Sequence, residues 1–154
     1  MQFKHALTAV VAMVGLVAAK PVDMELEKRN ATTPVTYLGS QSRILSGGAT
    51  ARGLVYTAGV VPSLNGSIVE GGIRNETAQV IANIAAILEE AGTSWEYVLK
   101  TTVYLANMSD YSAMNEVYAE LLPDPKPART AIEVAQLPGN FSIEVEAIAA
   151  VPHY

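Results

Sequence analysis

The hydrophobic period changes repeatedly along the chain, and the order of these changes constrains the fold most strongly. Between residues 73 and 91, apolar side chains recur every three to four positions, which predicts a helix. Between residues 99 and 106 they alternate with polar ones, which predicts a strand. The order is β-β-α-β-α-β-β, with strand segments at 53–59, 99–106, 130–134 and 142–151 and a second helix capped by Ser109 or Asp110. It predicts one α+β domain, in which two helices cover one face of a single sheet.

The opposite face of such a sheet would remain uncovered. An apolar sheet face needs a partner, so the pattern predicts an oligomer. Residues 30–42 are polar and rich in Thr and Ser, and we expect them to form an exposed arm. The sequence contains no internal repeat and no sign of a second domain.

The first 29 residues have the layout of targeting and processing segments. Residues 1–19 join a short polar start to an apolar run that ends in small residues, which predicts a signal peptide. The run is too short to span a bilayer, and no Arg precedes Arg29, which disfavours a mitochondrial presequence. Residues 20–29 are polar and end in the dibasic pair Lys28-Arg29, so we expect a propeptide. The remaining domain is 30–154, with its core at 44–151.

Five of the seven asparagines stand in the glycosylation pattern Asn-x-Ser/Thr. These are Asn30, Asn65, Asn75, Asn107 and Asn140. So many matches behind a signal peptide indicate a eukaryotic secretory protein. We therefore expect a secreted glycoprotein.

The composition excludes several kinds of chemistry. Ten basic and fifteen acidic side chains give a formal net charge of -5, so we expect neither nucleic acid nor a membrane as partner. The chain has no cysteine, and its two histidines stand at positions 5 and 153. Thiol nucleophiles and His- or Cys-based metal sites are therefore excluded, and we expect no metal or cofactor. Any chemistry has to use carboxylates, Arg, Tyr, hydroxyl groups or the backbone.

Arg129 and Glu144 stand out because they interrupt otherwise apolar strand segments. Buried charges are costly unless they are paired. One interpretation is a structural salt bridge of Arg129 with Glu144 or Glu146, or an edge strand with solvated charges. The other is a guanidinium that binds a substrate carboxylate while a nearby Glu positions or activates water. Residue spacing alone leaves both open.

The stretch from residue 53 to 151 resembles the reactive-intermediate deaminase family (RidA/YjgF, RutC-like), and we expect a secreted eukaryotic member of fungal type. The matching segments are 57–59 with Pro62, 90–92, 98–104, 114–118, 127–130, 137–138 and 143–148. The resemblance implies a chorismate-mutase-like (YjgF-like) fold with a single mixed sheet. It also implies a homotrimer in which the sheets line a central barrel and three clefts lie between subunits.

The same resemblance implies an activity and its residues. Family members hydrolyse reactive enamine and imine carboxylates to 2-keto acids and ammonia. By position, Arg129 is the arginine that binds the carboxylate of the small substrate and Glu144 is the acid that positions water. Gly59 is the glycine whose backbone borders the pocket. A protonated imine is already electrophilic, so holding it and aiming a water suffices, without a cofactor.

Two positions depart from the family pattern. Leu45 stands where a tyrosine commonly closes the pocket, and Ala131 stands where active deaminases usually have cysteine; both are expected at the substrate site. The missing tyrosine leaves alternatives open. One is a tailoring enzyme of secondary metabolism that hydrates, cyclises or hydrolyses a carboxylated intermediate. Another is a non-catalytic secreted protein that binds a small carboxylate or a partner.

Overall fold

The computed structural model describes residues 34–152. The predicted signal peptide, the propeptide with its dibasic pair, Asn30 and His153 lie outside these residues. Within them, no helix is long and apolar enough to cross a membrane.

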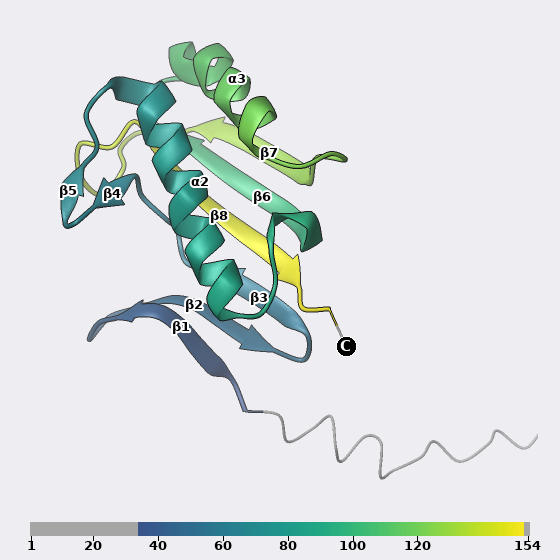
Figure 1. The fold of residues 1–154 in the computed structure, drawn as a ribbon. Helices are drawn as coiled ribbons and strands as arrows, with labels where there is room; N and C mark the ends of the chain where they lie inside the picture. The colour runs from purple at the N-terminus through teal and green to yellow at the C-terminus, as the bar shows by residue number, and fades with distance from the viewer. Residues whose placement is uncertain (1–33, 153–154) are drawn as a thin grey trace, which may run out of the picture. The chain divides into compact units, whose positions relative to one another are not determined.

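A six-stranded mixed sheet forms the centre of the fold (Figure 1). Its strands are β1 (Thr36–Gln41), β2 (Ser46–Ala51), β3 (Leu54–Thr57), β6 (Val98–Leu105), β7 (Ala128–Glu133) and β8 (Ile143–Ala150). The spatial order is β1-β2-β3-β8-β6-β7. Only the β6–β7 pair is parallel, and β7 forms one edge of the sheet. The parallel pair exists because α3 carries the chain back across the sheet between these two strands.

Both long helices lie on the same face of the sheet, as the sequence pattern predicts (Figure 1). They are α2 (Gly72–Glu90) and α3 (Tyr111–Leu121). A short 3₁₀ helix, η1 (Trp95–Tyr97), follows α2, and another, η2 (Met108–Asp110), leads into α3. The α+β class with one mixed sheet and two helices is therefore confirmed. Asn107 caps η2 by accepting a hydrogen bond from the Ser109 N–H, at 2.8 Å.

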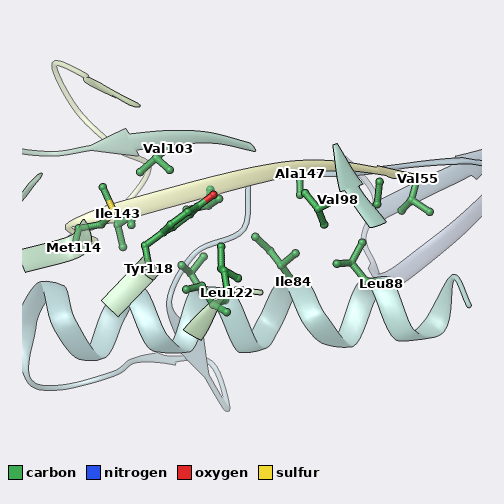
Figure 2. Packing of buried hydrophobic residues seen from close by; sticks show 14 of the residues in the cluster. Val55, Ile84, Leu88, Val98, Val103, Met114, Tyr118, Leu122, Ile143 and Ala147 are labelled. Atoms are coloured by element: carbon green, nitrogen blue, oxygen red, sulfur yellow. The ribbon is translucent and has the colours of Figure 1, made fainter. Parts of the chain in front are cut away.

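The core fills the space between the helices and the sheet (Figure 2). From α2, the stripe predicted by the 3.6-residue period supplies Val80, Ile84 and Leu88, each fully buried. From β6, Val103 and Leu105 point toward the helices, whereas the alternate positions face the other side. The sheet therefore has two chemically different faces: one is covered by the helices and apolar, and the other, here called the open face, is not covered by them.

Two local expectations are wrong. Part of the predicted exposed arm is the edge strand β1, because Leu38 is buried against the core while most of its neighbours stay exposed. The helical spacing of Met114, Tyr118 and Leu121 predicts that all three are buried, but Leu121 is 47% exposed and Leu122 is buried in its place, since the chain leaves the helix there. The stretch before α2 also forms a small hairpin, β4 (Ser63–Leu64) with β5 (Ser67–Ile68).

Candidate active site

Gly59 lies directly against the carboxylate of Glu144. Just beyond β3, Val60 pairs with Val145 through two backbone hydrogen bonds of 2.8 and 3.0 Å, which holds the two segments side by side. A Cβ atom on residue 59 would lie 1.8 Å from Glu144 Oε1. Only glycine at position 59 therefore allows the Glu144 carboxylate to lie so close to the backbone.

Glu144 is half-buried on the open face of the sheet, opposite the helices. Among the described residues, no donor forms a hydrogen bond with its carboxylate, whereas the neighbouring Glu146 accepts one from the Tyr104 hydroxyl at 3.1 Å. Burial raises the pKa of Glu144, and the nearby charge of Glu146 raises it further. Such a carboxylate has free lone pairs for a water molecule and an increased proton affinity, as a general base requires.

Leu45 lies near Gly59 at the turn between β1 and β2. The two residues line a common hollow of about 530 Å³, whose wall also contains Val60 and Ile87. Its lining includes the polar side chains Asn83 and Glu90, and both are already engaged. The Asn83 amide donates to the Val61 and Ser63 carbonyls, and the Glu90 carboxylate accepts a hydrogen bond from the Gly39 N–H at 2.8 Å. Leu45 therefore sits beside the predicted pocket glycine and gives the hollow an apolar rim.

Arg129 lies on the edge strand β7, beneath α3. Its guanidinium carbon is 4.6 Å from the ring centre of Tyr118 and 5.6 Å from that of Tyr111. Its Nη2 donates to the Tyr111 hydroxyl at 3.2 Å. Within residues 34–152, no carboxylate lies within salt-bridge distance of it. The interpretation as a structural salt bridge with Glu144 or Glu146 is therefore wrong for the single chain.

A single chain does not bring Arg129 and Glu144 together. They are on successive strands in sequence, but β6 lies between these strands in the sheet. Arg129 pairs with Thr101 of β6 and Glu144 with Tyr104, an offset of three residues. This offset places them on opposite faces, with backbones roughly 14 Å apart by standard strand spacings. Each chain therefore carries two separate candidate half-sites: Arg129 on one, and Glu144 with Gly59 and Leu45 on the other.

Ala131 belongs to the Arg129 half-site. It lies two residues further along β7, on the same face, and packs against the core opposite Val103.

The aromatic partners of Arg129 were not predicted from the sequence. The helical spacing predicts only that Tyr118 is buried, and it assigns no role to Tyr111. Their spacing offered a signal, because Tyr111, Met114 and Tyr118 recur at helical intervals on the face that reaches Arg129. That this face meets β7 rather than another strand follows only from the tertiary structure.

Another hollow, of about 640 Å³, lies between the end of α2, η1 and the end of α3. Its charged side chains are Glu89, Glu96 and Glu120, without a basic residue. It would repel a carboxylate, so we do not place the site there. The described part of the chain contains no group of three or more His, Cys, Asp and Glu side chains placed to hold a metal ion.

The fold and these candidate half-sites define a class of protein: a small α+β domain with an arginine at one sheet edge that has no acidic partner among the described residues, and a half-buried carboxylate on the open face. The family model described as Endoribonuclease L-PSP matches residues 42–151. The chain belongs to this family, the RidA/YjgF/RutC family.

Individual relatives agree with this assignment. A RutC family protein of Pyrococcus horikoshii is 46% identical over 122 residues, which cover 78% of this chain and 91% of that protein. The mouse protein named 2-iminobutanoate/2-iminopropanoate deaminase is 42% identical over 98 residues, covering 62% of this chain and 72% of its own. The crystal structure of yeast Mmf1 matches with a TM-score of 0.74 and 31% identity, over 77% of this chain and all of that one.

Proposed function

We propose that this protein is a hydrolase that deaminates reactive enamine or imine carboxylates to 2-keto acids and ammonia. The observation that carries the proposal is the Arg129 guanidinium, which lies on an exposed edge strand without an acidic partner among the described residues. An unpaired, oriented guanidinium is suited to bind a carboxylate through two parallel hydrogen bonds. The name of the mouse relative, an iminobutanoate and iminopropanoate deaminase, gives the reaction class.

In this mechanism the substrate is a protonated 2-imino acid. Arg129 holds its carboxylate, and Glu144 accepts a proton from a water molecule as the water oxygen bonds to the imine carbon. The resulting carbinolamine takes up a proton at nitrogen. Its carbon–nitrogen bond then breaks, the hydroxyl loses its proton, and a 2-keto acid and ammonia leave. Gly59, whose backbone is exposed beside Glu144, leaves room for the Glu144 carboxylate in the position from which it acts on the water.

The separation of the half-sites supports assembly into a homotrimer with sites between subunits. Arg129 of one subunit would complete the Glu144 half-site of its neighbour. The open face of the sheet is suited to such contacts, because it displays large exposed apolar side chains from three strands. These are Tyr37, with 57% of its surface exposed, Tyr56 with 50% and Ile132 with 42%. Light scattering should give three times the chain mass, and a monomer at micromolar concentration would contradict the shared site.

The direct test is hydrolysis of 2-aminoacrylate generated in the assay by a coupled enzyme. The wild-type chain should release pyruvate and ammonia above the uncatalysed rate, and both Arg129→Ala and Glu144→Ala should abolish most of the increase. Equal rates for the wild type and Arg129→Ala would refute the carboxylate-binding role. The Leu45 side chain favours a second candidate, because it offers no hydroxyl at the pocket rim. Carboxylate binding that needs Arg129, without any hydrolysis, would support a non-catalytic binding protein.

We further propose that the protein is secreted and N-glycosylated. Four of the five sequon asparagines lie within the described residues, and all four are exposed: Asn65, Asn75, Asn107 and Asn140. They lie in the β4–β5 turn, at the start of α2, after β6 and before β8, which all gather at one end of the domain (Figure 1). None lies on a strand of the open face, so glycans are compatible with the proposed assembly. Secreted protein from a eukaryotic host should gain mobility after removal of N-glycans, and unchanged mobility would refute glycosylation.

A further inference from the structure

An aromatic wall on α3 determines where the Arg129 guanidinium lies. Tyr118 provides the inner part of this wall. Its ring lies 4.6 Å from the guanidinium carbon, and its hydroxyl shares a 2.8 Å hydrogen bond with Thr101, which is fully buried. Because Tyr118 is itself only 6% exposed, this ring is fixed by the core and forms a rigid platform.

Tyr111 provides the outer part of the wall. It is 39% exposed, and its hydroxyl accepts a hydrogen bond from Arg129 Nη2 at 3.2 Å. The hydrogen bond of Tyr111 with Asn115, together with the charge of Arg129, lowers the pKa of its hydroxyl. The phenol therefore interacts with the cation through both its ring face and its oxygen.

Aromatic partners orient a guanidinium without neutralising it. A guanidinium has five N–H donors, of which Tyr111 takes one and the Met114 sulfur, at 3.9 Å, makes a weak contact with another. At least three donors remain for a ligand. A carboxylate in place of Tyr111 would occupy these donors and cancel the charge that attracts the substrate. The wall thus limits the freedom of a long side chain on an exposed strand and keeps its charge available.

We infer that Tyr111 is a positioning residue, which holds Arg129 in the rotamer that receives the ligand carboxylate. This inference rests on the proposed function of Arg129 as the carboxylate-binding residue. Preorganisation reduces the entropy that ligand binding would otherwise cost, so its loss weakens binding. Since Tyr111 contacts the guanidinium rather than the reacting carbon, its removal changes affinity more than the chemical step.

The test compares Tyr111→Phe with the wild type and with the control Tyr97→Phe, all in the full chain. Tyr97 has a similar exposure, 41%, but it lies in η1, which follows the C-terminal end of α2, and not on α3. Binding of the keto acid 2-oxobutanoate is measured by calorimetry, and imine hydrolysis gives kcat and KM. Tyr111→Phe keeps the ring and loses one hydrogen bond to a charged group. It should raise Kd and KM about 3- to 10-fold, with kcat within about two-fold and Tm unchanged.

The outcomes separate this inference from the proposed function. Tyr97→Phe should leave Kd and KM at the wild-type values. If Tyr111→Phe also binds 2-oxobutanoate as the wild type does, while Arg129→Ala loses binding, the positioning role is overturned and the proposed function stands. If the wild type binds no carboxylate and hydrolyses no imine, the proposed function fails first.

Discussion

Replacing Gly59 with alanine tests whether the close approach to Glu144 matters for activity rather than for folding. The new Cβ would lie 1.8 Å from Glu144 Oε1 and 2.8 Å from Cδ. Ordinary contact begins near 3.4 Å, so the carboxylate has to move away by about 1.6 Å. The atoms that must move are the end of a flexible side chain on the open face, whereas the backbone at residue 59 is not in the left-handed region.

These geometric facts predict a large effect on catalysis and a small one on stability. A side-chain torsion of Glu144 that is strained away from its rotamer costs about 0.5–1.5 kcal/mol, so the free energy of unfolding should fall by no more than about 1.5 kcal/mol. The displaced carboxylate no longer aims its water, and displacements of about 1 Å can reduce rates by about 100-fold. We therefore expect kcat/KM for imine hydrolysis to fall by roughly 10- to 100-fold.

The assay is steady-state deamination, with urea unfolding of the same preparations. A double-mutant cycle provides the control, since Gly59→Ala in a Glu144→Ala background places the methyl group where no carboxylate remains. In that background, Gly59→Ala should lower kcat/KM little further. Wild-type kcat/KM for Gly59→Ala, or the same loss in both backgrounds, would refute a role that acts through the Glu144 carboxylate.

Four further predictions concern protonation and stability. Because Glu144 must be ionised to act as a base and its pKa is raised, kcat/KM should fall as the pH decreases through a midpoint above the ordinary carboxyl value of 4.5. Glu146→Gln removes the like charge, so this midpoint should move to lower pH in a pH–rate profile. Glu76→Ala should destabilise the fold by about 3 kcal/mol in urea unfolding, because this buried carboxylate accepts hydrogen bonds from the Ser142 N–H at 2.6 Å and hydroxyl at 2.9 Å. Leu88→Ala should cost about 3 kcal/mol by leaving a cavity under α2, and an unchanged midpoint for either variant would contradict these burial arguments.

The core was predictable from sequence wherever one period persisted over a whole element. The stripe that includes Val80, Ile84 and Leu88 emerged because a helix of 19 residues repeats the same signal several times. The edge strand β1 escaped prediction because only Leu38 of its six residues is buried. An edge strand of this kind depends on its neighbour for hydrogen bonds, so its own residues carry little of the signal.

The candidate site divides in the same way. Arg129, Glu144 and Gly59 were identified in the sequence because charges within apolar strands and a motif order are local properties. The role of buried Glu76 could not be predicted from the sequence, since a single acidic residue in a helix gives no indication that it contacts the loop before β8. The spacing of Tyr111 with Tyr118 does not reveal its contact with Arg129, because Arg129 is 18 positions away on a strand that only packing brings near.

The sequence by itself determined the class of fold, the family and the charged residues available for chemistry, since period, composition and motif order are written in the chain. Tertiary structure alone decided how those residues are grouped. The order β8-β6-β7 inserts a strand between Arg129 and Glu144, and the three-residue offset places them on opposite faces. Strand order and register are set by long-range packing and hydrogen bonding, which residue spacing along the chain does not encode.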